Sequence, residues 1–144
     1  MQEIKVDHIT WNGKQYPVYC DLRVLDKIQN EFETITQFER ALLGQEIVYD
    51  EDGNAERDDA GNIIKKDKEP SIMAAVRGFY LMLEEGRRIE ESQGIKVDPI
   101  SEDDILNYAG NFYTLGLLVH GIFMKCFASK KKEEDQTTSK KMRT

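Results

Sequence analysis

The sequence predicts an α+β fold in which an N-terminal β-hairpin precedes a mainly α-helical bundle. Residues 3–20 alternate between polar and apolar side chains on both sides of an Asn12-Gly13 pair, which is the strongest short-range signal for a two-residue hairpin turn. Beyond this hairpin, apolar residues recur at the three- and four-residue intervals of amphipathic helices. A polar insertion, residues 45–70, separates the first helical stretch from the later ones.

Size and composition are those of a single globular domain. The chain has 144 residues, of which 40% are hydrophobic and 33% are charged. A chain of this length hides enough apolar surface to fold without a disulfide or a metal. The formal net charge of −7 repels the phosphate backbone, so general nucleic-acid binding is not expected. This charge is typical of a soluble surface, and the alternative is attraction of a basic partner. We expect one α+β domain over residues 1–128.

The return strand of the hairpin leads directly into the first helices. Pro17 lacks an N–H group, so this strand is expected at a sheet edge or with its proline at an unpaired position. Asp21 is placed to cap the next helix. The apolar residues of that helix recur at helical spacing and are Leu22, Leu25, Ile28 and Phe32. A capping box at residues 36–39 predicts a second, short helix over residues 37–43, which Gly44 ends.

The insertion at residues 45–70 is rich in charge and contains two turn-type clusters, at residues 50–54 and 58–62. This composition predicts a protruding hairpin or a mobile loop in place of a packed element. Its aspartates invite comparison with a calcium-binding loop. However, a loop that starts at residue 50 has Ala55 where glycine is needed and Gly61 where glutamate is needed. We therefore expect no metal site in this segment.

A long helix is predicted to begin after Pro70-Ser71. Its wide apolar face consists of Ile72, Met73, Val76, Phe79, Tyr80 and Leu83. Beyond Glu84 the residues are almost all charged or polar. The end of this helix is therefore expected to project into solvent before Gly94.

The last helix is predicted over residues 101–128, because a capping box begins at Ser101. Its apolar residues cover nearly the whole circumference, and such a helix is buried on several sides. Two interpretations remain open: it is the central core helix of a monomer, or part of it is an interface with a partner or another copy. Gly110 and Gly121 share one face and allow close helix approach. Residues 129–144 have one methionine as their sole apolar residue, so a disordered charged tail is expected.

The residue types that carry catalysis are sparse and isolated. Cys20 and Cys126 lie far apart among apolar neighbours, which is typical of ordinary buried thiols. His120 lies in an apolar helix, where a hydrogen-bonded core histidine is more typical than a ligand, and His8 is equally isolated. Phosphate-binding loops and nucleophile motifs are absent from the sequence. We expect neither catalytic residues nor a cofactor or metal site.

Membrane insertion and secretion are not expected from the sequence. The N-terminus is polar and alternating, unlike a secretory signal. The longest apolar stretch, residues 112–128, contains Thr114, His120 and Lys125, so it is too short and too polar to span a bilayer. The cytoplasm is the expected location.

Three stretches carry a resemblance to a known family: ITWNGKQYPV at residues 9–18, DLRVLDKIQ at residues 21–29, and NYAGNFYTLGL at residues 107–117. Together with the order of the predicted elements, they resemble tail assembly chaperones of long-tailed, siphovirus-type bacteriophages or prophages of Gram-positive bacteria. The likeness extends over about residues 3–128 and is one of layout.

The resemblance implies a non-catalytic chaperone that acts during tail morphogenesis. Proteins of this family bind the tail tape measure protein and the tail tube protein in the cytoplasm of the bacterial host, and they are absent from the mature virion. Self-association is a further option. The alternatives are a structural tail or head-completion protein, and a small prophage-encoded regulatory binding protein.

Apolar residues on the two long helices are the candidate contacts with such a partner. They are Phe79, Tyr80, Leu83, Phe112, Tyr113, Leu117 and Met124. The same residues are candidates for the hydrophobic core, so only their exposure in the folded protein separates the two roles.

Overall fold

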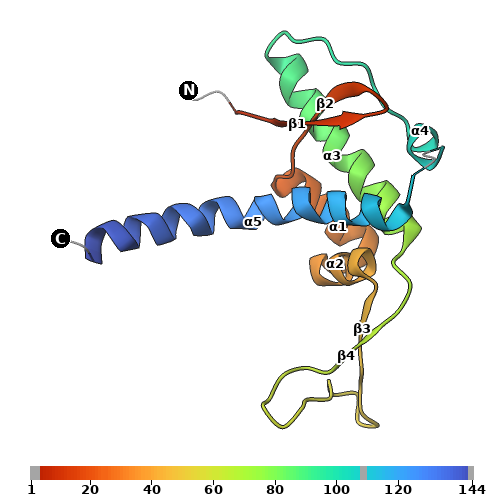
Figure 1. Ribbon diagram of the computed structural model, residues 1–144, viewed down its shortest axis with the longest axis vertical. Coiled ribbons are helices and arrows are strands. Elements are labelled where there is room, and N and C mark those ends of the chain that lie inside the picture. The colour runs from red at the N-terminus through yellow and green to blue at the C-terminus, as the bar shows by residue number, and fades with distance from the viewer. Residues whose placement is uncertain (1–3, 108–109, 143–144) are drawn as a thin grey trace.

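The computed structural model describes residues 4–107 and 110–142, with side chains as far as residue 127. It has the predicted α+β fold, with an N-terminal hairpin followed mainly by helices. In chain order the elements are β1 (Asp7–Trp11), β2 (Lys14–Val18), α1 (Leu22–Phe32), α2 (Ile35–Leu43), β3 (Gln45–Ile47), β4 (Lys65–Asp67), α3 (Ile72–Ser92), α4 (Glu102–Leu106) and α5 (Phe112–Met142). Figure 1 shows α5 crossing the middle of the molecule, with the β1–β2 hairpin on one side and the β3–β4 arm on the other.

The β1–β2 hairpin has the predicted turn. Asn12 and Gly13 have φ values of 51° and 80°, and two consecutive positive φ values are required by a type I′ turn, whose twist matches that of the strands. Among the described residues this sheet consists of β1 and β2, so Pro17 lies on an edge strand as predicted. Trp11 and Val18 are buried and mark the face of the hairpin that packs against the helices.

Side chains cap the first two helices. The Asp21 carboxylate accepts hydrogen bonds from two backbone N–H groups in the first turn of α1, as predicted. Helix α2 ends at Gly44, which has the expected left-handed conformation. Its start is earlier than predicted, because the Thr34 hydroxyl accepts the N–H of Gln37 at 2.9 Å. Thr34 and Gln37 have the same capping spacing as residues 36–39, so two overlapping start signals compete at this point.

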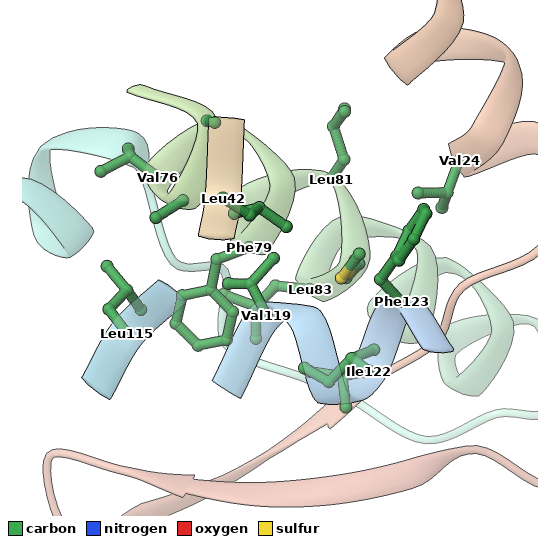
Figure 2. Packing of buried hydrophobic residues seen from close by; sticks show 14 of the residues in the cluster. Val24, Leu42, Val76, Phe79, Leu81, Leu83, Leu115, Val119, Ile122 and Phe123 are labelled. Carbon is green, nitrogen blue, oxygen red and sulfur yellow. The ribbon is translucent and has the colours of Figure 1, made fainter. Parts of the chain in front are cut away.

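Helix α3 runs through the centre of the hydrophobic core. Figure 2 shows the Phe79 ring of α3 beside Leu115 and Val119 of α5. Phe38 of α2 is fully buried, and a Cβ on Gly78 would lie 2.6 Å from its ring. The absence of a side chain at Gly78 therefore lets α2 pack closely against α3. The largest fully buried side chains are Phe38, Phe79, Ile28, Met82, Ile105, Val18, Val76 and Val119.

The charged second half of α3 is packed, contrary to the prediction that it projects into solvent. The β1–β2 hairpin lies across it, and the N–H of Tyr19 donates to the carbonyl of Met82 at 3.1 Å. Ile89 and Glu90 are buried there, and the Glu90 carboxylate pairs with the His8 ring. The number of charged residues did not predict this packing, because the aliphatic parts of arginine and glutamate side chains can be buried while their charged ends pair with each other.

The predicted last helix is interrupted. Helix α4 ends at Leu106 and α5 begins at Phe112, whereas the sequence predicts one helix over residues 101–128. The Asn111 side chain accepts the N–H of Tyr113 at 2.8 Å and so supplies a start signal for α5. The apolar spacing continues across the break, which is why periodicity alone predicts a single helix.

Two predictions fall wholly or partly outside the described residues. The helix predicted over residues 101–128 includes residues 108–109, which lie outside the described part of the chain. The backbone of α5 is helical as far as Met142, through most of the segment for which the sequence predicts a disordered tail. The side chains from residue 128 onward, and residues 143–144 altogether, lie outside the described part of the chain.

The polar insertion forms a protruding two-stranded arm (Figure 1), which is the hairpin alternative of the prediction. At its tip, three backbone hydrogen bonds join Val48, Glu56 and Ile64 in a closed triangle, with lengths of 2.8–3.1 Å. A tight turn projects on each side of this triangle. In each turn the first residue, Asp50 or Asp58, accepts two backbone N–H groups through its carboxylate. The aspartates therefore serve the turn geometry.

Candidate binding surface on helix α5

The residues predicted to contact a partner divide into a buried and an exposed group. Phe79 is fully buried and Leu83 is 5% exposed. The prediction is wrong for these two residues, because the surrounding core leaves them no surface to offer. Tyr80 is half-buried against the core, and the Arg77 guanidinium lies 5.4 Å from the centre of its ring. The predicted contact residues on α5 are more exposed than those on α3.

Three of the four predicted residues on α5 are exposed. Tyr113, Leu117 and Met124 are 51%, 66% and 40% exposed, and Phe127, which was not predicted as a contact, is 44% exposed. Phe112 is half-buried, with its ring 4.3 Å from that of Tyr113. We call Tyr113, Leu117, Met124 and Phe127 the α5 stripe. Large apolar side chains gathered on one helix face mark an interaction surface more often than isolated ones do.

The α5 stripe lies opposite the core face of its own helix. Its members are separated by four, seven and three positions, which places them on one side of a helix. The core side of α5 is made by Leu115, Val119, Ile122 and Phe123. One side of α5 is therefore core, as the first interpretation of the last helix predicts, and the other side is exposed in the described part of the chain; whether that side is an interface stays a prediction.

Gly121 lies beside the α5 stripe and leaves open space. A Cβ placed on it would have no heavy atom within 4 Å. The surface of α5 is therefore recessed at Gly121, between the larger side chains of Leu117 and Met124. A backbone from another molecule can approach closely where a helix presents glycine between larger side chains.

Two polar contacts join α5 to neighbouring elements. The His120 ring and the Glu39 carboxylate of α2 are 3.0 Å apart, which confirms that this histidine is hydrogen-bonded and not isolated. The Lys125 amine donates to the Asp7 carboxylate of β1 at 3.1 Å. The buried residues Leu115, Val119 and Ile122 set the rotation of α5 about its axis, and these two polar contacts add to it.

The charged hollow between α1 and α3 offers no comparable surface. Its volume is about 330 Å³, and arginines and glutamates line most of it. Arg87 pairs with Glu84 and Glu91 at 2.8 Å, and Arg88 pairs with Glu85 at 2.7 Å. Both guanidinium groups therefore already have carboxylate partners within the protein. Across residues 4–107 and 110–127, histidine, cysteine and acidic side chains form no group of three that could hold a metal ion.

Sequence reasoning missed Phe127 and the meeting of two cysteines. Phe127 continues the spacing of Leu117, His120 and Met124 in alternating steps of three and four residues, which is the spacing of helices that pack against helices. That signal was available in the sequence. The second omission had no such signal, because Cys20 and Cys126 line the same hollow only through the folding of distant segments.

Neither the family models, the curated proteins nor the solved structures contain a match to this chain. In the described residues, none of the helices has the length and apolar character needed to cross a membrane.

Proposed function

We propose that this protein is a non-catalytic phage tail assembly chaperone that binds an apolar helical segment of its client along the α5 stripe. One observation carries the proposal: large apolar side chains with exposures from 40% to 66% line the outer side of a helix whose inner side is core. The sequence resemblance gives the client class, which is the tail tape measure protein together with the tail tube protein. The expected site of action is the cytoplasm of the bacterial host.

A helix is the partner that best fits the α5 stripe. Alternating steps of three and four residues present side chains to the grooves of a second helix. An amphipathic helix laid in such a groove is a common mode of peptide recognition. Gly121 leaves room for the client backbone near the centre of the stripe. The tape measure protein is a suitable client, because the resemblance implies that such a protein is coated by its chaperone before assembly.

We expect reversible binding, because a chaperone that covers apolar surface of its client must leave when the tail assembles. Burying a large apolar side chain contributes about 1.5–3 kcal/mol, and the four members of the stripe are already partly covered. Association and side-chain ordering consume several kcal/mol of this gain. The stripe therefore supports moderate affinity, which lets tail assembly displace the chaperone.

The proposal is tested by placing a charge in the α5 stripe. We expect Leu117→Glu to lower the amount of soluble tape measure protein about tenfold when the two proteins are made together in bacteria. Leu22→Glu is the matched control, because Leu22 is an exposed leucine, 79% accessible, on a different helix. It should leave the soluble yield unchanged. Circular dichroism of both variants verifies that the fold is intact.

Three results would contradict the proposed function or its binding site. Equal client yield with both variants would remove the α5 stripe as the binding site. Detection of the chain by mass spectrometry in purified virions would favour a structural tail or head-completion protein. A wild-type dimer that Leu117→Glu converts to a monomer, with no effect on the client, would assign the stripe to self-association.

A further inference from the structure

Cys20 and Cys126 meet at one hollow although they are distant in the sequence. Cys20 lies between β2 and α1, and Cys126 lies on α5. Both half-buried thiols line a hollow of about 340 Å³ that also includes Tyr19, Lys125 and Asp7. The Cys126 side chain lies close enough to Cys20 to raise the pKa of the Cys20 thiol. The fold thus brings together a pair of sulfur atoms that sequence reasoning treats as separate buried thiols.

The surroundings of the pair make its oxidation slow at neutral pH. Burial and the neighbouring Cys126 raise the pKa of the Cys20 thiol above its usual range, and only the thiolate is a nucleophile. The Lys125 amine is engaged by the Asp7 carboxylate at 3.1 Å. Both cysteines are nevertheless only half-buried, and the hollow that they line offers a small reagent a route to them.

We propose that Cys20 and Cys126 form a modification site at which a small-molecule disulfide converts the two thiols into an intramolecular disulfide. One cysteine loses its proton and attacks the reagent, which forms a mixed disulfide and releases one thiol. The second cysteine then loses its proton and attacks the protein sulfur of the mixed disulfide, which releases the second thiol. The two protein thiols are oxidised, and the reagent is reduced to two thiols.

The disulfide would clamp α5 to the start of α1. It closes a long loop, since nearly the whole domain lies between Cys20 and Cys126, and such cross-links restrict the unfolded chain strongly. Cys126 lies on α5, and Figure 1 shows the C-terminal part of α5 extending beyond the rest of the domain. Oxidation would therefore stabilise the packing of α5 against the rest of the domain. This inference does not depend on the proposed chaperone function.

The test uses the full chain and oxidised glutathione. We expect incubation at pH 8.5 to give a monomer that has lost two hydrogens, as measured by mass spectrometry without reductant. The melting temperature should rise by about 5–15 °C and return to its original value with dithiothreitol. The same reaction should be markedly slower at pH 6.5, because fewer thiolates are present.

Single serine variants are the controls. Cys20→Ser and Cys126→Ser should each lose the two-hydrogen product and the rise in melting temperature, while keeping the wild-type circular dichroism spectrum. A wild-type monomer carrying two glutathione adducts, a disulfide-linked dimer, or no reaction after a day at pH 8.5 would each overturn the proposal.

Discussion

Asp21 carries two roles that oppose each other. Its carboxylate caps α1, and the same group hydrogen-bonds with the Glu85 carboxyl of α3. Glu85 is buried and pairs with Arg88 at 2.7 Å, and this partner lowers the pKa of Glu85. Burial and the nearby Glu85 raise the pKa of Asp21 to about 6. One of the two neighbouring carboxyls therefore keeps its proton into the mildly acidic range.

The pH dependence of this pair has a definite sign. Because the pKa of Asp21 is higher in the folded than in the unfolded state, the native state binds its proton more tightly. The contribution of Asp21 to stability is fully present below its usual pKa of about 4. It is lost as the pH rises through about 6. The lowered pKa values of Glu31, Glu85 and Asp104 act in the opposite direction, at more acidic pH.

We predict that Asp21→Asn stabilises the protein at pH 8 but not at pH 4.5. Asparagine caps helices about as well as aspartate, and it removes the charge that the buried Glu85 carboxylate opposes. The expected gain in the free energy of unfolding is about 1 kcal/mol at pH 8, after allowance for solvent screening. Urea unfolding at both pH values measures it. A difference between variant and wild type that stays constant with pH would contradict the assigned pair.

At the scale of elements, the crossing of β2 over α3 depends on Gly86. A Cβ at this position would lie 2.5 Å from the carbonyl carbon and oxygen of Pro17. Both obstacles are backbone atoms, which cannot rotate away as a side chain could. The close contact of the hairpin with α3 therefore requires glycine, and it explains why the charged half of α3 is covered.

We predict that Gly86→Ala lowers the free energy of unfolding by about 2–3 kcal/mol, because the hairpin must shift from α3. Gly121→Ala is the matched control on a helix. A Cβ there meets no heavy atom within 4 Å, so the higher helix propensity of alanine should stabilise by about 0.5–1 kcal/mol. Urea unfolding compares the two. Equal and small effects would show that the hairpin does not press on Gly86.

Elements with local signals could be predicted from the sequence, and those set by distant contacts could not. Asn12-Gly13 specified its turn and Asp21 its helix start, because both act within a few residues. The break before α5 was missed because the apolar spacing of residues 101–128 hides the Asn111 cap. At the candidate site, periodicity placed Leu117 on a helix but could not decide which side of that helix α2 and α3 would cover.

Across the whole molecule, long-range contacts join the hairpin and helices into one unit. Arg77 of α3 pairs with Glu31 of α1 at 2.7 Å and also with Glu102 of α4. The hairpin contributes Trp11 to the same core, where its ring meets that of Phe79 edge-on with centroids 4.9 Å apart. Residues from β1, β2 and α1 through α5 all belong to one buried cluster. Loss of any one element would expose the apolar surface of its neighbours.

We predict that the hairpin and the helices unfold together. Trp11 is the sole tryptophan, so its fluorescence reports on the hairpin, whereas far-ultraviolet circular dichroism reports mainly on the helices. Because Trp11 packs on Phe79 at the centre of α3, the two urea transitions should have midpoints within about 0.2 M of each other, as two-state unfolding requires. A fluorescence transition at clearly lower urea would mean that the hairpin detaches first. The contacts between β2 and α3 would then be too weak to join the two, and Gly86→Ala should widen the gap between the midpoints.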